Sequence, residues 1–294
     1  MNMKKTLARA KKKALMALCG VNPVLASKLE YKKKFGRPLD LDDPKTLNEK
    51  LMWLKFNRYA DDPTVVTCAD KYAVRFYLEE NGYGQYVNEL IGVWDRVEDI
   101  DFDALPDRFA MKVNHGCGYN IICTDKRKFD VEKAKNTLNT WLKEDYWKKH
   151  AELHYRHIQP KIICEKFISG DGGKLPVDYK FYCFNGEPMY IGNFIERDLD
   201  AHTIIRGYFD TDWKPLDICK TTPKDGNFVR PSRLEDMVEL ARQMSKPFPF
   251  VRVDFYECDG KIIFGEFTFT PTGCMGTYYT EEAEKKYGEL LRID

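Results

Sequence analysis

Two dipeptides, Asn185-Gly186 and Asp259-Gly260, each separate a pair of apolar runs, and they constrain the fold more than any other feature of the chain. Both favour the left-handed backbone of a tight β-turn, which folds one strand antiparallel onto the next. The four strands expected around these turns cover residues 178–184, 187–195, 250–256 and 261–270. The C-terminal half of the chain is therefore expected to contain antiparallel β-structure.

Helix signals alternate with strand signals along the rest of the chain. Capping-box patterns begin at Thr46 and Ser232, and Asp130 is placed to cap a third helix. The expected helices cover residues 46–54, 70–80, 130–145 and 232–244, and further strands are expected over 89–94, 109–113, 120–124 and 161–168. This alternation of helices and hairpins predicts an α+β fold with mainly antiparallel sheets.

Residues 1–34 form a basic segment, with ten lysines and arginines against a single acidic residue, and hence a charge of +9. The whole chain carries a net charge of only +1. Apolar residues recur at helical spacing from Leu7 to Leu18. A basic amphipathic helix of this kind predicts peripheral contact of residues 1–20 with an anionic membrane, and the alternative is a solvated helix packed on the body.

Several classes of protein are disfavoured. No apolar run approaches the roughly 20 residues needed to span a bilayer, and the stretch Ala14–Cys19 is too short for a signal peptide. None of the nine cysteines forms a C-x-x-C pair, which indicates reduced, buried thiols in a cytoplasmic protein. The aromatic residues do not interleave with the basic ones, which argues against nucleic-acid binding. We expect a cytoplasmic protein, with any peripheral contact at the inner face of the cell membrane.

Two groups of residues are candidates for chemistry. Lys112 ends a strand and precedes the loop 114–118, whose glycines would let backbone N–H groups approach phosphate oxygens, although such turns are also common in purely structural roles. Arg252 and Asp254 alternate with apolar residues on one strand of the last hairpin, and Glu266 lies on the returning strand. Two carboxylates on one sheet face suit Mg²⁺, which prefers oxygen ligands, but a surface ion pair with Arg252 explains the charges equally well.

The register of that hairpin decides whether Asp254 and Glu266 share a face. A two-residue turn pairs Cys258 with Lys261 and places Glu266 on the wrong face. A three-residue loop pairs Glu257 with Lys261 instead and sets Arg252 opposite Glu266. Arg252, Asp254 and Glu266 then share one face. We therefore predict an odd-length loop or a compensating bulge.

Six stretches of the chain follow one another in a recognisable order: TLNEKLMWLKF (46–56), DKYAVR (70–75), FAMKVNHGCGYNIICTDK (109–126), PKIICEKFI (160–168), DYKFYCFNGEP (178–188) and VRVDFYECDGKIIFGEFTFTP (251–271). Together they resemble the TupA-like branch of the ATP-grasp superfamily, which is associated with biosynthesis of teichuronopeptide and other surface polysaccharides. The resemblance implies an ATP-grasp fold with a small mobile lid subdomain, and ATP and Mg²⁺ as cofactors. The subdomains that it implies are a basic segment (1–34), an N-terminal subdomain (35–104), the lid (105–168) and a C-terminal subdomain (169–294).

The resemblance also implies which residues bind the nucleotide. Lys71 and Lys112 are expected to bind its phosphates, with Lys112 also acting in catalysis, and a loop containing His115, Gly116 and Gly118 is expected to cover them. The hinge expected to read adenine consists of Glu165, Lys166, Phe167 and Ile168. The remaining nucleotide contacts are expected from Asp178, at the ribose, and Lys180.

By the same resemblance, Asp254 and Glu266 are expected to bind Mg²⁺, and Arg252 is expected to stabilise the reaction intermediate. The family usually has Asn two residues after the metal-binding Glu, whereas this chain has Thr268, so we expect a weaker or water-mediated second metal contact there. The other positions on which turnover depends match the family pattern: Asp254, Glu266, Lys71 and Lys112.

The function implied is a carboxylate–amine ligase that forms an amide through an acyl phosphate. The expected partners are a carboxylate from a uronic acid or surface polysaccharide and the amine of an amino acid. A ligase acting on a peptide, a nucleotide-binding scaffold without turnover and a glycosyltransferase are the alternatives. Asp210-Thr-Asp212 is the only candidate D-x-D motif with a small middle residue for the last of these, and it lies in an expected loop.

Overall fold

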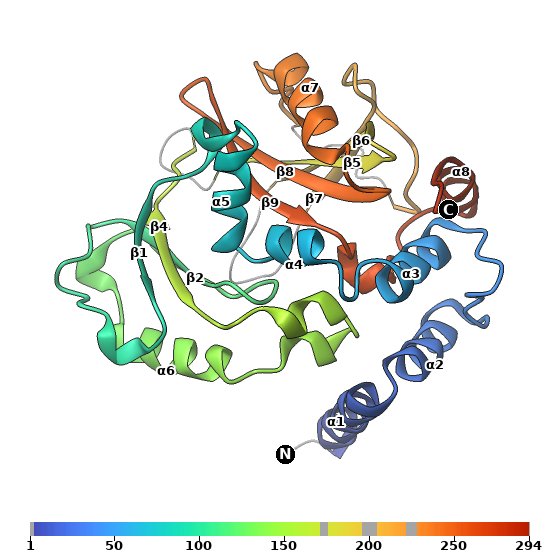
Figure 1. Ribbon diagram of the computed structural model, residues 1–294, viewed down its shortest axis with the longest axis horizontal. Helices are drawn as coiled ribbons and strands as arrows, with labels where there is room; N and C mark the ends of the chain where they lie inside the picture. The colour runs from blue at the N-terminus through green and yellow to red at the C-terminus, as the bar shows by residue number, and fades with distance from the viewer. Residues whose placement is uncertain (1–2, 171–175, 196–204, 222–227, 294) are drawn as a thin grey trace.

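The computed structural model of the protein describes residues 3–170, 176–195, 205–221 and 228–293, with side chains from residue 10 onward. Its α-helices are α1 (Met3–Val21), α2 (Pro23–Phe35), α3 (Leu47–Asn57), α4 (Pro63–Ala69), α5 (Ala73–Glu80), α6 (Val131–Leu142), α7 (Leu234–Ser245) and α8 (Glu281–Leu290). Its strands are β1 (Leu90–Trp94), β2 (Phe109–Val113), β3 (Asn120–Cys123), β4 (Ile162–Lys166), β5 (Asp178–Phe184), β6 (Glu187–Ile195), β7 (Ile205–Phe209), β8 (Phe250–Cys258) and β9 (Lys261–Thr268). Figure 1 shows two separate sheets with helices around them, so the α+β prediction is confirmed.

The larger sheet has the strand order β7-β6-β5-β8-β9, and its neighbouring strands are all antiparallel. Helix α7 covers one face, as Figure 1 shows, and the Ala241 carbonyl lies 3.9 Å from the sulfur of Cys183 on β5. Alternate residues of β8, Val251, Val253 and Phe255, are fully buried on this face. They join the largest core of the molecule, which also takes side chains from α3 and α4. The opposite face carries the charged residues of β5, β8 and β9 beside buried aromatic rings such as those of Tyr182 and Tyr190.

The smaller sheet, which we call the lid sheet, has the order β1-β4-β2-β3 and is also antiparallel. It has a core of its own, in which Phe109 and Met111 of β2 and Ile162 of β4 pack with Leu138 of α6. Strand β1 pairs with β4, so the lid sheet takes in residues 90–94, upstream of the expected lid boundary. A separate core makes this sheet an independent packing unit beside the larger one.

The N-terminal basic segment forms two helices. Helix α1 ends at Val21, Asn22 caps α2 by accepting the Leu25 N–H at 2.9 Å, and Gly36 ends α2 in the left-handed conformation. Figure 1 shows both helices at the edge of the molecule, and α1 contacts the 3-10 helix Tyr146–Lys149, which follows α6. Among the described residues, no helix is long and apolar enough to cross a membrane.

The expected helix over 70–80 is wrong at its start. Helix α5 begins only at Ala73, and a separate helix, α4, ends at Ala69. Asp70 interrupts them, because its extended backbone cannot continue α4 and its carboxylate accepts the Tyr72 N–H at 2.7 Å. The sequence does carry a signal for α4, since Asp62 caps it and proline follows at the first helical position.

The two capping-box predictions have different outcomes. At α3 the Glu49 carboxylate accepts the Thr46 N–H at 3.0 Å, which confirms the first box. At α7 the second box is wrong, because Ser232 donates its hydroxyl to Glu257 on β8 and Glu235 pairs with Arg230. Competing tertiary partners thus replace a local cap. Several elements also end earlier than expected, since α6 stops at Leu142, β4 at Lys166, β3 at Cys123 and β9 at Thr268.

The buried histidine His154 generates a prediction about pH. It is fully buried, both ring nitrogens lack a hydrogen-bond partner, and burial lowers its pKa from 6.5 to about 3. Below pH 6.5 the imidazole of His154 therefore binds a proton in the unfolded chain but stays neutral in the folded chain. Folding stability is lost as the pH falls from 6.5 toward 3. We expect this histidine to cost about 2 kcal/mol of unfolding free energy between pH 7 and 5.

Urea unfolding of wild type and His154→Phe at the two pH values checks this. The variant should lose about 2 kcal/mol less than wild type on acidification. His157→Gln is the matched control, because it removes a histidine of the same 3-10 helix that is bonded to Asp61 at the surface. Equal losses in wild type and His154→Phe would contradict the prediction.

Candidate active site

The β8–β9 hairpin brings Asp254 and Glu266 to the same face of the larger sheet. Its turn has two residues, since Cys258 pairs with Lys261, so the three-residue loop and the Arg252–Glu266 register that it implied are wrong. The compensating bulge, the other form of that prediction, is confirmed: the register shifts beyond Phe255, and Asp254 pairs directly with Glu266.

Gly265 is the extra residue of the bulge. A Cβ atom at this position would lie 3.1 Å from the backbone oxygen of Asp254 and 3.1 Å from the ring of Tyr256. A side chain here would therefore press on the strand that carries the metal-binding candidates. Glycine suits the position because the two backbones approach so closely.

Five charged side chains form one connected cluster on this face. Arg252 bonds both oxygens of Asp254, at 2.7 Å each, and reaches Glu266 at 3.0 Å. Lys180, opposite Asp254 on β5, lies 2.5 Å from its Oδ2 atom, and Asp178 lies 3.2 Å from the same ammonium group. The surface ion-pair interpretation fails for Asp254, because its side chain is only 2% exposed.

The cluster sets the protonation of its members. Burial by itself would raise the pKa of Asp254, but Arg252 and Lys180 hold the pKa of this carboxyl below its usual range. Burial lowers the pKa of Lys180. Glu266 is more open, with a third of its side chain exposed, and it accepts a hydrogen bond from the Thr268 hydroxyl at 3.1 Å. The face thus presents carboxylate and hydroxyl oxygens, the donor atoms that Mg²⁺ prefers.

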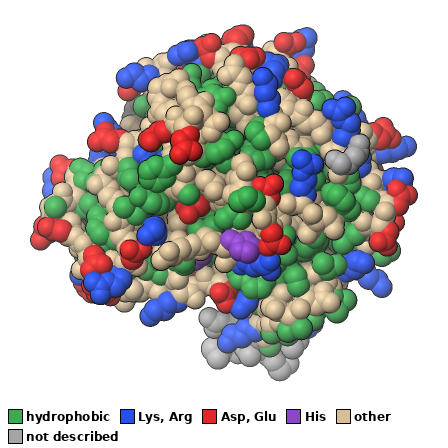
Figure 2. Space-filling view, viewed as in Figure 1, with side chains coloured by type: hydrophobic (Ala, Val, Ile, Leu, Met, Phe, Trp, Pro, Cys, Tyr) green, Lys and Arg blue, Asp and Glu red, His purple; other side chains and the backbone are tan. Residues whose placement is uncertain are grey.

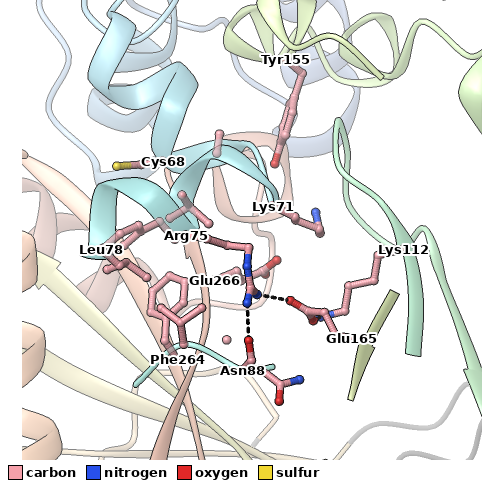
Figure 3. A pocket seen from close by; sticks show the side chains of 15 residues that line it. Cys68, Lys71, Arg75, Leu78, Asn88, Lys112, Tyr155, Glu165, Phe264 and Glu266 are labelled. Carbon is pink, nitrogen blue, oxygen red and sulfur yellow. Dashed lines mark hydrogen bonds and ion pairs between the residues drawn. The ribbon is translucent and has the colours of Figure 1, made fainter. Parts of the chain in front are cut away.

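A pocket between the two sheets adjoins this face (Figure 3). It is lined from both sides: Lys112 and Glu165 come from the lid sheet, Arg75 comes from α5, and Glu266 comes from β9. Glu165 lies 2.6 Å from Lys112 and 3.0 Å from Arg75, so its carboxylate joins two cations. Positive groups therefore stand opposite the carboxylates of the larger sheet.

Lys71 enters the pocket from the break between α4 and α5, the point at which the helix prediction was wrong. Its ammonium group donates to the Gly116 carbonyl, and its backbone N–H lies 3.4 Å from the Asn114 carbonyl. Asn114 in turn donates to Asp70 at 2.8 Å. The helix break and the glycine loop thus hold each other in place, which brings Lys71 and Lys112 into one pocket as expected.

The glycine loop follows β2 and faces the same region. The side chain of Cys117, at the tip of the loop, is exposed. The side chain of His115 is buried and turned toward the lid interior, where its Nε2 atom lies 3.1 Å from the Glu144 carbonyl. Any contact of residue 115 with a nucleotide is therefore left to its backbone. Gly118 has a positive φ of 79°, which glycine adopts readily.

The expected adenine hinge is only partly gathered at the pocket. Glu165 lines it, whereas the Lys166 side chain is exposed and pairs with Glu89 at 3.1 Å. The Phe167 ring lies under the guanidinium of Arg108, 4.0 Å from its carbon. Ile168 follows at the end of the strand, partly buried. A hinge that acts mainly through its backbone is compatible with this arrangement.

The D-x-D candidate lies elsewhere. Asp210 folds its carboxylate back onto the N–H groups of Asp212 and Lys214, at 3.0 and 2.8 Å, and Asp212 is exposed beside Lys214. These contacts describe an ordinary turn after β7, and neither carboxylate lines the pocket between the sheets. The arrangement does not support the glycosyltransferase alternative.

A family model described as "TupA-like ATPgrasp" matches residues 49–292. The chain belongs to the TupA-like ATP-grasp family. Its α+β architecture of two antiparallel sheets facing a shared pocket is therefore the ATP-grasp fold. No protein of curated function matches the sequence.

Among solved structures, the chain is similar to D-alanine–D-alanine ligase from Bacillus anthracis complexed with ATP, with 16% identity and a TM-score of 0.45. The match covers 76% of this chain and 61% of the ligase, so the chain spans about three fifths of that protein. D-cycloserine synthetase DcsG is 14% identical over 79% of this chain and 72% of its own, with a TM-score of 0.43. The ATP-grasp ligase PsnB is 10% identical over 79% and 60%, with a TM-score of 0.42.

Among the polar residues that line the pocket, Arg75, Asn88 and Tyr155 were not expected as site residues. Arg75 bonds Glu165 and the Asn88 carbonyl, as Figure 3 shows. Nothing in the sequence singles them out, because each reaches the pocket only through tertiary contacts. Arg75 was visible only as part of the matched stretch 70–75.

The charge cluster predicts that the two carboxylates differ in their effect on stability. Asp254→Asn leaves Arg252 and Lys180 buried without their shared counter-charge, and we expect the unfolding free energy to fall by about 3 kcal/mol or more. Glu266→Gln removes one bond to a partly exposed group, so we expect a loss of about 1 kcal/mol or less. Urea unfolding of both variants at pH 7 measures the difference. Equal losses would show that the cluster is not held together by Asp254.

Proposed function

We propose that this chain is an ATP-dependent carboxylate–amine ligase that forms an amide through an acyl phosphate. The observation that carries the proposal is the meeting of Asp254, Glu266 and Arg252 on one sheet face beside a pocket lined by Lys71 and Lys112. Family membership supports it. The solved structures to which the chain is similar include ligases complexed with ATP or with Mg and ADP.

The residues present fit ATP and Mg²⁺. Asp254 and Glu266 are directly cross-strand neighbours, with the oxygen donors that Mg²⁺ takes, and Lys71 and Lys112 supply positive charge from the other side of the pocket. When bound, Mg²⁺ would neutralise phosphate charge between the two carboxylates. Asp178 and Glu165 would bind the ribose and adenine parts of the nucleotide.

The reaction that we propose has two steps. An oxygen of the substrate carboxylate attacks the γ-phosphorus of ATP, and the bond from that phosphorus to the ADP oxygen breaks. A neutral amine then attacks the acyl carbon, phosphate leaves, and the amine loses a proton. The work of Arg252 and Lys112 is electrostatic, because both steps develop negative charge on oxygen.

Lid closure is the second part of the proposal. The loop 114–118 lies beside the pocket, because the Gly116 carbonyl accepts a hydrogen bond from Lys71, which lines it. Closing this loop over ATP would exclude water, which would otherwise hydrolyse the acyl phosphate. The separate core of the lid sheet supports its movement as a unit.

Thr268 is the departure from the usual pattern. Its hydroxyl donates to Glu266 at 3.1 Å, so in this arrangement it orients a metal-binding carboxylate. Thr268 is the one position that favours the alternative, a nucleotide-binding scaffold without turnover. A uronic acid or surface-polysaccharide carboxylate and an amino-acid amine are the substrates that we propose for the ligase, and a peptide substrate is the alternative.

Nucleotide binding provides the first test. Calorimetry with ATP and Mg²⁺ should detect binding to the wild type, and Lys112→Ala should weaken it by about tenfold or more, since a charge-assisted contact to phosphate is lost. Hydrogen exchange at residues 114–119 should slow when ATP is added. The control Lys133→Ala removes an exposed lysine of α6 and should leave binding unchanged.

Turnover separates the ligase from the scaffold. ADP and phosphate release should appear when a uronic acid and an amino acid are supplied together, and Glu266→Gln should abolish it while the protein stays folded. Absence of ATP binding by the wild type would overturn the whole proposal. Binding without product release, across a panel of uronic acids paired with amino acids, would favour the scaffold.

We also propose peripheral contact of the N-terminal helices with an anionic membrane at its inner face. Lys11, Lys12 and Lys13 of α1 are all exposed. On α2, Leu25 and Leu29 are exposed at 44% and 52%. Figure 2 shows hydrophobic and basic side chains side by side at this end of the molecule. Such a mixture suits an anionic lipid surface, on which apolar side chains insert between lysine contacts.

Vesicle flotation tests the membrane contact. Binding to vesicles containing phosphatidylserine should fall in a triple variant with Lys11, Lys12 and Lys13 changed to Gln, and in Leu25→Glu, and should weaken as salt rises. Changing Lys246, Lys285 and Lys286 to Gln is the matched control, because it removes the same charge at exposed sites on other elements. If the α1 and control variants bind equally, the segment has only a structural role.

A further inference from the structure

The polar face of the larger sheet continues beyond the charge cluster to its other edge. Cross-strand pairs place Asp254 beside Lys180, Lys180 beside Gly192 of β6, and Gly192 beside Tyr208 of β7. Directly paired residues point to the same side of a sheet, so this row carries the catalytic face from β8 to β7. In the neighbouring row on the same face, two residues further along β6, Phe194 pairs with Arg206 of β7.

Two cationic groups stand over the ring of Phe194. The Lys180 ammonium and the Arg206 guanidinium carbon each lie 5.4 Å from its centroid, so they are separated by no more than twice that distance. Arg206 also lies 5.7 Å from the ring of Tyr278. Lys180 is buried at the inner end of this arrangement, whereas Arg206 is exposed at its outer end.

Arg206 differs from Lys180 and Arg252 in its charge partners among the described residues. Lys180 and Arg252 are both held by Asp254, but within the described part of the chain no carboxylate lies within salt-bridge distance of Arg206. A guanidinium placed over aromatic rings keeps its N–H groups available at its edge, and those groups match a carboxylate or phosphate in pairs. The two rings restrict the side chain, which reduces the entropy lost on binding.

We propose that Arg206 binds a second anionic group, a phosphate or a carboxylate, of the substrate whose carboxylate is activated at Arg252. The inference rests on the proposed function and names its substrate class: sugar acids that carry another negative charge. Arg206 lies three strands from Arg252 and four residues further along them, so the two backbones are on the order of 20 Å apart. Because two long arginine side chains shorten that gap, a substrate with one or two sugar rings between its anionic groups suits this separation.

Calorimetry in the presence of ADP and Mg²⁺ tests this, with three probes: glucuronate, glucuronate 1-phosphate and digalacturonate. We expect at least one of the two dianionic probes to bind wild type about tenfold or more tighter than glucuronate. Arg206→Gln should remove that gain and leave glucuronate and ADP binding unchanged. Arg206→Lys keeps the charge without the planar fork and should recover part of the gain.

The control is Arg233→Gln, which removes an exposed arginine at the start of α7, on the other side of the sheet. It should leave the binding of all three probes unchanged. The inference is overturned if neither dianionic probe gains affinity, or if the gain survives Arg206→Gln. Failure of the proposed function is a different result, since ADP would then not bind to the wild type at all. The probe that gains identifies the second group as phosphate or carboxylate.

Discussion

The register of the β8–β9 pairing is the constraint on which the site depends, because it decides whether Asp254 and Glu266 share a face. A two-residue turn would carry Glu266 to the face occupied by α7, and one extra residue, Gly265, returns it to the side of Asp254. The same bulge keeps Phe264 and Phe267 together on the core face, with ring centroids 4.9 Å apart. Core packing and carboxylate placement therefore require the same irregularity, and neither can be changed without the other.

The charge cluster explains how the neighbouring carboxylates Asp254 and Glu266 can stand side by side in the folded chain. Arg252 already neutralises Asp254 and Glu266, so both carboxylates are paired before any metal arrives. If Asp254 and Glu266 hold Mg²⁺ as proposed, the metal would supply positive charge beside the carboxylates that Arg252 bonds. Lys180, 2.5 Å from Asp254, is a second cation on the same carboxylate. In the proposed reaction, Arg252 would then stand beside the substrate carboxylate.

Local signals made much of the fold predictable. The turn dipeptides and the Thr46 capping box depend on a few neighbouring residues. The structure confirms the turns and the cap that they predict. The bulge was also readable in principle: Phe264 and Phe267 are three residues apart, and two apolar residues at odd spacing can share a face only across an extra residue. The position of Lys71 beside the glycine loop and the isolation of Arg206 were not readable. Both depend on which strands and loops meet in space.

The movement open to the lid sheet is limited by a buried polar junction at its base. Lys55 of α3, fully buried, donates to the carbonyls of His150 at 3.0 Å and Gly273 at 3.2 Å. Glu152, also buried, accepts the Thr270 hydroxyl at 2.5 Å. Burial lowers the pKa of Lys55 and raises the pKa of Glu152, so pulling these groups apart would strand polar atoms in an apolar interior. The segment around residues 150–152 is therefore tied to the body, while the lid sheet keeps a core of its own. The proposed closure over ATP would therefore require the lid sheet to rotate about this junction.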